Sequence, residues 1–318
     1  MVAISYLALL FISSATATLQ SSVTLLYQNN LNWTDDANHI SVLLLDSMSQ
    51  TAASQACQSL HETLLPAQAV HDHSADFVNQ LSFLAFQNNH PVGQQFWIQG
   101  GTISVDASGK VIHFNSAQSA HSALPVLCSQ SSTGSTTGTS VATSSNKVTV
   151  SSASNSFTGF RNKKSFRFLG IPFANPVVRF QHSSLISKTH TDFDATNFGS
   201  QCWQTGTANF SEQCLFLNVF TPFLPSASIA KTTLKPVVVW IHGGAFTSGT
   251  GADPTFDGGD LVSRGDVVVV TINYRLSSIG FLALPNTTIT GNYGIGDQVT
   301  ALQWVQQNIA AFGGDKAS

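Results

Sequence analysis

The second half of this 318-residue chain predicts an α/β fold with a doubly wound, mostly parallel sheet, preceded by a small α+β module. Two near-continuous apolar runs, at residues 236–241 and 266–273, are typical of strands that helices cover on both faces. A helix is predicted from the N-cap Asp297 to Gly313-Gly314, which suits a left-handed C-cap. Five apolar residues fall near one face of this helix: Val299, Leu302, Val305, Ile309 and Phe312.

Length and composition predict two domains and exclude some partners. The chain is 42% hydrophobic, which is enough for a sizeable core. Charged residues make up only 9% of it and the net charge is −3, so nucleic acid or an anionic membrane surface is not expected as a partner.

Residues 1–17 are predicted to be a secretory signal peptide. The apolar run Val2–Ile12 is too short to span a bilayer, and Ala15-Thr-Ala17 suits a cleavage site. The alternative is a membrane anchor, which is disfavoured because no later segment is long and apolar enough to span either. The expected location is therefore extracellular.

Residues 18–128 form the predicted N-terminal module. Helical spacing at Ala52–Leu60, a strand and turn at Phe96–Gly101 and a short strand at Pro125–Cys128 weakly resemble C-type lectin-like domains. The resemblance implies glycan contact. Calcium-dependent sugar binding is not expected, because the sequence has no Trp-Asn-Asp and the candidate proline stands in His90-Pro91-Val92. The pair His71 and His73 is predicted to be solvated, and no metal site is expected.

Residues 129–147 are dominated by Ser, Thr and Gly and predict a flexible linker. The alternative is an internal loop of one domain, which requires an unusually long insertion without secondary structure.

Residues 148–318 resemble the type-B carboxylesterase and lipase family, which includes the cholinesterases. Five blocks in the family's order carry the resemblance: 168–174 (FLGIPFA), 211–219 (SEQCLFLNV), 242–246 (HGGAF), 273–275 with 280–282 (NYR, GFL), and 291–298 with the helix that follows. It covers only the N-terminal part of the family's catalytic domain, and it implies an incomplete α/β-hydrolase fold.

The loop His242-Gly-Gly-Ala-Phe246 is the candidate site. Ester hydrolysis places negative charge on the carbonyl oxygen, and fixed N–H donors lower that barrier. The resemblance implies that the backbone N–H groups of Gly244 and Ala245 are two donors of an oxyanion hole. The alternative is a glycine turn with no catalytic role. No Gly-x-Ser-x-Gly occurs in the chain, so the nucleophilic Ser, the acid and the catalytic His are expected beyond residue 318.

Four cysteines allow three pairings, and spacing alone does not choose between them. The resemblance implies a Cys202–Cys214 disulfide, which leaves Cys57 with Cys128. It also implies a structural ion pair between Arg179 and Glu212. Three sequons agree with secretion, at Asn32, Asn209 and Asn286.

The expected function is hydrolysis of a small ester or lipid through an acyl-serine intermediate, with no cofactor. This chain alone is expected to be inactive, because it lacks the triad. The alternative is a secreted binding or adhesion protein that carries a non-catalytic cholinesterase-like domain.

Overall fold

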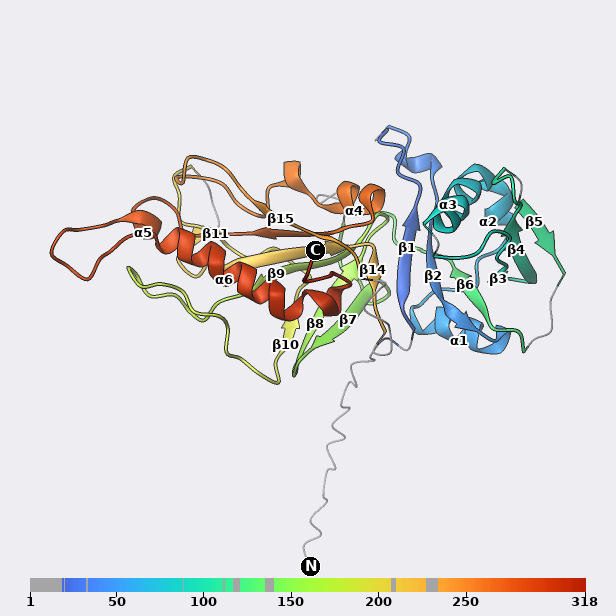
Figure 1. Ribbon diagram of the computed structural model, residues 1–318, viewed down its shortest axis with the longest axis horizontal. Coiled ribbons are helices and arrows are strands. Elements are labelled where there is room, and N and C mark those ends of the chain that lie inside the picture. Colours follow the sequence, from blue (N-terminus) through green and yellow to red (C-terminus); the bar gives the residue numbers. More distant parts are fainter. Residues whose placement is uncertain are drawn as a thin grey trace, which may run out of the picture.

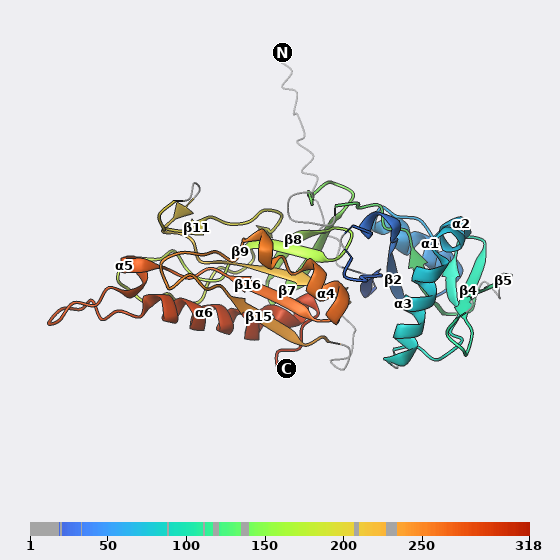
Figure 2. The same ribbon diagram turned by 90° about the horizontal axis from the view of Figure 1, so that it is seen from above.

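The computed structural model describes residues 19, 21–32, 34–87, 89–110, 112–116, 121–134, 140–206, 210–226 and 234–318. The predicted signal peptide, Asn209 and residues 135–139 of the predicted linker lie outside this set. The chain forms two lobes that lie side by side, each built on a seven-stranded sheet (Figures 1 and 2).

The first sheet has the strand order β14-β1-β2-β6-β3-β4-β5. Six of its strands come from the N-terminal region: β1 (Val23–Tyr27), β2 (Ser41–Met48), β3 (Phe96–Ile98), β4 (Gly101–Val105), β5 (Ile112–Asn115) and β6 (Leu124–Cys128). The seventh, β14 (Phe223–Leu224), comes from the second half of the chain and pairs antiparallel with β1. The two halves of the sequence therefore share one sheet.

Three helices cover the first sheet: α1 (Gln50–Ser59), α2 (Ala67–Asp72) and α3 (Ser74–Phe86). The predicted helix, strand and closing strand of this region correspond to α1, β3 and β6. Ser49 caps α1 by accepting a hydrogen bond from the Ala52 N–H. A disulfide joins Cys57 of α1 to Cys128 of β6, with 5.6 Å between their Cα atoms, and so holds the helix against the sheet.

The second sheet has the order β10-β8-β9-β13-β16-β15, with β7 beside β8. Its strands are β7 (Lys147–Ser152), β8 (Asn155–Arg161), β9 (Phe166–Pro172), β10 (Asp192–Asp194), β13 (Phe216–Thr221), β15 (Val237–Ile241) and β16 (Val268–Ile272). β15 and β16 are parallel, whereas β7, β8, β9, β13 and β16 pair antiparallel in turn. The described sheet is therefore mixed rather than mostly parallel, because short connections such as Ala153-Ser154 between β7 and β8 permit only antiparallel neighbours.

The two apolar runs differ in burial. All five residues of β16 are buried, as predicted. β15 is the last strand of the sheet among the described residues, and Val238, Trp240 and Ile241 remain 36–40% exposed. The prediction that β15 is fully buried was therefore wrong. Its side chains stay partly exposed because, within the described chain, this edge strand has a neighbouring strand on one side only.

The long helix α6 (Tyr293–Asn308) begins before the predicted N-cap and continues into the short helix η4 (Ile309–Phe312). Asn292 is the N-cap residue and Asp297 is buried inside the helix, so the prediction that Asp297 is the cap was wrong. Gly313 ends η4 with a φ of 85°, as predicted. Figure 2 shows α6 running beside β15 and β16.

The apolar face predicted for this helix was partly wrong. Val305, Ile309 and Phe312 are buried, but Val299 and Leu302 are 50% and 42% exposed. The buried residues at the start of α6 are instead Tyr293, Gly294, Asp297, Thr300 and Ala301. Because several of these inward-facing residues are small or polar, a search for large apolar residues assigned the wrong face to the first turns of the helix.

Several described residues of the segment predicted to be a flexible linker are hydrogen-bonded to the two lobes. The Ser131 N–H and hydroxyl donate to Glu62 at 2.9 and 2.8 Å, and the Ser132 hydroxyl donates to the Arg161 carbonyl at 2.9 Å. Asn146 is 5% exposed. These residues are fixed because they surround the buried Arg161–Glu62 ion pair, whose N–O distance is 2.6 Å.

Within the described chain, no helix is both long and apolar enough to cross a membrane.

Candidate functional site

The loop His242–Phe246 follows β15 at one edge of the second sheet. Because β15 and β16 are parallel, the segment Asn273-Tyr274-Arg275 after β16 leaves the sheet at the same edge. Ligands of open α/β sheets bind outside the carboxyl ends of the strands, so the loop has the position that the candidate site requires.

His242, the first residue of the loop, is held in place by Tyr274. Its ring is stacked on Tyr274, with 4.4 Å between centroids, and the Tyr274 hydroxyl donates to the His242 carbonyl at 2.9 Å. Burial lowers the pKa of His242, so the ring is neutral at pH 7. Nδ1 lies 2.9 Å from the Gly243 carbonyl, which only accepts, so we assign the proton to Nδ1. Nε2 is then a buried acceptor that finds no partner among the described residues.

Three consecutive residues of the loop have left-handed backbone conformations: Gly244 (φ 113°), Ala245 (φ 52°) and Phe246 (φ 61°). The two glycines are not equivalent. A Cβ on Gly244 would lie 2.1 Å from the Ser248 carbonyl oxygen, whereas a Cβ on Gly243 would meet nothing within 4 Å. The loop geometry therefore requires glycine at 244 and not at 243.

The N–H groups of Gly244 and Ala245 donate to no acceptor that the described residues provide. The turn hydrogen bonds of the loop use other donors, since Thr247 and Ser248 donate to the Gly244 carbonyl at 3.0 and 3.2 Å. Residues 243–248 are exposed. The two donors are thus available to an anion, although the loop faces solvent rather than the enclosed cavity that the oxyanion-hole interpretation predicts.

The far end of the loop is clamped by Gln204, a buried residue whose role the sequence did not reveal. Its Nε2 donates to the Gly249 carbonyl at 2.9 Å, and its Oε1 accepts from the Gly249 N–H at 2.8 Å. Gln204 follows Cys202, which forms the predicted disulfide with Cys214 at a Cα separation of 4.9 Å. The disulfide loop therefore helps to position the candidate site.

Two buried asparagines hold the next segment of the loop. The Asn273 Oδ1 accepts from the Gly251 N–H at 2.8 Å, and the Asn218 Nδ2 donates to the Gly251 carbonyl at 3.1 Å. The Asn273 Nδ2 also donates to the Cys214 carbonyl at 3.1 Å. Both asparagines belong to the sequence blocks that carry the family resemblance, and the structure gives them this positioning role.

A buried ion pair fixes the segment after β16. Arg275 Nε and Nη2 each donate to Asp297 at 2.7 Å, and the Arg275 backbone N–H adds a third bond at 3.1 Å. Neither side chain is more than 1% exposed. This pair joins α6 to the strand end beneath the loop, and so holds Tyr274 against His242.

The ion pair between Arg179 and Glu212 forms as the resemblance implied, with Arg179 Nε 2.8 and 2.7 Å from the two carboxylate oxygens. The hydrogen bond from Arg179 lowers the pKa of Glu212, and the same bond raises the pKa of Arg179. Both side chains are partly exposed, at 61% and 31%, so the pair is peripheral to the loop.

The geometry and the family comparison agree. The model of the carboxylesterase family matches residues 144–318, more than half of the chain. The chain belongs to the carboxylesterase family. Its second sheet is accordingly part of an α/β-hydrolase fold, and the type-B resemblance is confirmed for this region. The match begins at residue 144, so the lectin-like interpretation of residues 18–128 stays a prediction.

Several curated proteins share this carboxylesterase region. Para-nitrobenzyl esterase of Bacillus subtilis is 44% identical over 163 residues, which cover 47% of this chain and 32% of that protein. Cholinesterase of Mus musculus is 40% identical over 170 residues, covering 48% and 27%. Thyroglobulin of Rattus norvegicus is 41% identical over 163 residues, covering 48% and 6%. The chain therefore spans about a third or less of the length of these relatives.

Two predicted glycosylation sites lie on the surface of the described chain. Asn32 is exposed, and its Oδ1 accepts from the Thr34 hydroxyl at 2.7 Å. Asn286 is exposed in the turn before Thr290. Their modification stays a prediction.

Proposed function

We propose that this carboxylesterase domain belongs to a hydrolase of carboxylic esters and that its loop 242–246 supplies oxyanion donors. The observation that carries the proposal is the pair of free N–H groups at Gly244 and Ala245, in a loop held by Tyr274 and Gln204. Donors that are fixed before the reaction stabilise the developing oxyanion without reorganisation. One such donor contributes about 10²–10³ in kcat.

The chain alone is proposed to be inactive, because donors without a Ser–His pair cannot form the acyl-enzyme. The test is an assay of the purified chain with para-nitrophenyl acetate. We expect turnover equal to the uncatalysed background. Turnover that a serine-directed organophosphate abolishes would contradict the proposal.

A chimera tests whether the loop is competent. Residues 144–318 would replace the matching segment of para-nitrobenzyl esterase, whose own remaining residues would supply the rest of the domain. We expect the folded chimera to hydrolyse a para-nitrobenzyl ester. A folded chimera without activity would favour a different role for this region.

That different role is a non-catalytic binding or adhesion protein. Thyroglobulin, which is not named as an esterase, shares this region at 41% identity, so the family alone does not imply catalysis. The chimera distinguishes the two functions, since a loop that has lost its catalytic geometry does not support turnover.

We also propose that the protein is secreted. Both cysteine pairs are bonded, and disulfides persist in oxidising compartments. The test is expression with the native leader in a eukaryotic host. We expect chain in the medium with no titratable thiol, and retention in the cell would contradict secretion.

A further inference from the structure

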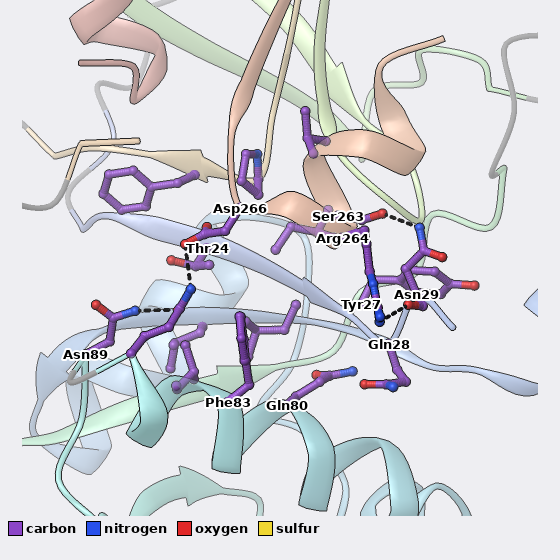
Figure 3. A pocket seen from close by; sticks show the side chains of 18 of the residues that line it. Thr24, Tyr27, Gln28, Asn29, Gln80, Phe83, Asn89, Ser263, Arg264 and Asp266 are labelled. Carbon is purple, nitrogen blue, oxygen red and sulfur yellow. Dashed lines mark hydrogen bonds between the residues drawn. The ribbon is translucent and has the colours of Figure 1, made fainter. Parts of the chain in front are cut away.

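A cavity of about 770 Å³ lies between the two lobes, away from the loop 242–246. Strand β1 and helix α3 line it from the N-terminal region, and helix α4 (Gly259–Gly265) lines it from the carboxylesterase domain (Figure 3). Its volume falls within the range of small-molecule sites, roughly 300–1,000 Å³, and such sites favour domain interfaces.

Hydrogen bonds hold both ends of this cleft. At one end the Asn29 Nδ2 donates to the Ser263 hydroxyl at 2.9 Å, and Arg264 Nη1 donates to the Asn29 carbonyl at 2.9 Å. At the other end Gln87 donates to the Asp266 carboxylate at 3.1 Å. The cleft is therefore a fixed feature of the joined lobes and not a loose gap between them.

The charged groups of the cleft are already engaged. Lys235 and Asp266 form an ion pair at 2.7 Å, and the Asp46 carboxylate accepts from the Ser22 N–H at 2.7 Å. Arg264 is used by the Asn29 carbonyl. The two cations, Lys235 and Arg264, and the two anions, Asp46 and Asp266, sum to zero formal charge, so the cleft favours a neutral ligand over an ionic one.

Gln80 is the strongest sign of a missing partner. It is 7% exposed, and both its Nε2 and its Oε1 lack a hydrogen bond within the described chain. In Figure 3 its side chain extends from α3 toward β1, across the cleft from Arg264. A buried amide without partners costs about 1–3 kcal/mol for each unsatisfied group. A ligand group that both donates and accepts, such as a hydroxyl, would satisfy it.

The residues near Gln80 add further neutral amide groups and one aromatic ring to the lining of the cleft. Within the described chain the carboxamides of Gln28 and Asn79, which also line the cleft, make no hydrogen bond, and Phe83 is 48% exposed. We propose that this interlobe cleft binds a neutral oligosaccharide, with Gln80, Gln28 and Asn79 bonding its hydroxyls and Phe83 packing against the apolar face of a sugar ring.

An extended peptide fits the cleft less well. β1 is paired with β2 along all five of its residues and with β14 at Val23 and Thr24. The Tyr27 carbonyl accepts from the Asn29 N–H at 3.0 Å. Little strand edge is left to which a peptide strand can add.

The test is titration calorimetry of the purified chain with three neutral sugars, maltotriose, triacetylchitotriose and mannotriose, and with trialanine as a peptide probe. We expect at least one trisaccharide to bind and trialanine not to bind. Gln80→Leu and Phe83→Ala should each weaken that binding at least about tenfold, the effect of one lost contact. Because the Gln80 amide has no protein partner, Gln80→Leu should leave the thermal midpoint unchanged or higher.

Phe114→Ala is the matched control, since Phe114 is 41% exposed on β5 and does not line the cleft. It should bind as the unaltered chain does. The proposal is overturned if no trisaccharide binds, if only trialanine binds, or if Gln80→Leu and Phe83→Ala bind sugar as tightly as Phe114→Ala. Phe83 is half exposed, so its variant folds and keeps the test decisive even if Gln80→Leu does not.

Discussion

The carboxylesterase domain has two contrasting boundaries. Where it meets the N-terminal region, opposite charges are paired across the boundary, as in the Arg161–Glu62 and Lys164–Asp36 ion pairs. At strand β15 and the outer face of α6 it instead exposes Trp240 and Val299. The first boundary is thus an interface of matched charges that joins the lobes. The second exposes large apolar side chains, of which Trp240 is partly covered by the ring of Phe256, with 4.5 Å between centroids.

The largest expected effect comes from breaking the matched boundary at Arg161. Arg161→Met leaves Glu62 as a buried charge without its cation, and such a change costs about 3–5 kcal/mol. The free energy of unfolding in urea measures it. Adding Glu62→Leu to the variant should recover most of the loss, because a well-packed apolar pair replaces buried ions at little cost. A single variant as stable as the unaltered chain would show that the pair does not hold the lobes together.

Asp297→Asn tests the buried pair beneath the candidate site. Arg275 would keep its charge and lose its counter-charge, which costs about 3 kcal/mol. Tryptophan fluorescence, to which Trp304 contributes from about two turns along α6, reports the unfolding transition. Unchanged stability would contradict the role assigned to Arg275 in holding α6 to the end of β16.

The matched boundary should also depend on pH. Burial alone would raise the pKa of Glu62, but hydrogen bonds from Ser131 and Ser129 and the Arg161 guanidinium outweigh it and lower the pKa below 4.5. A group with a lowered folded pKa contributes stability that is present above the unfolded value of 4.5 and is lost as the pH falls through the folded value. Unfolding free energies from pH 6 down to pH 3 should fall less steeply in Glu62→Gln. Parallel curves would contradict this.

The exposed boundary predicts a change in solubility with little change in stability. Val238→Lys places a charge on the 40% exposed edge strand and should reduce aggregation, while unfolding free energy stays within about 0.5 kcal/mol. Its partner Val269 is 3% exposed, so Val269→Lys should prevent folding. Light scattering and unfolding curves compare the two. Equal aggregation of Val238→Lys and the unaltered chain would mean that this edge does not drive association.

The smallest effect is expected at Arg179. Its pair with Glu212 is exposed to solvent, so Arg179→Ala should leave the thermal midpoint unchanged within error. A clear fall in the midpoint would show that this peripheral pair supports the disulfide loop more strongly than its exposure indicates.

Local sequence signals predicted β16, the glycine loop and the end of η4, because each depends on neighbouring residues. They did not predict the Gln204 clamp or the Arg275–Asp297 pair, since these contacts join residues far apart in the sequence. Asp297 lies just before the apolar positions of the helix and was therefore predicted to be its N-cap. Its full burial could not be predicted without knowing that Arg275 lies opposite it. The Ser and Thr residues after Cys128 predicted a free linker because composition does not reveal the buried ion pair that they bond.

The central claim is that the geometry of loop 242–246 serves catalysis, and the two glycines test it most directly. Within this chain a methyl group on Gly243 would meet nothing within 4 Å, whereas one on Gly244 would lie 2.1 Å from the Ser248 carbonyl oxygen of the same loop. Both substitutions, Gly243→Ala and Gly244→Ala, would be made in the chimera with para-nitrobenzyl esterase. The measurement is kcat for both variants, with circular dichroism to confirm that both are folded. We predict that Gly243→Ala retains activity and that kcat of Gly244→Ala falls about 10²–10³-fold, the effect of losing an oxyanion donor. Equal kcat values for the two folded variants would contradict the account.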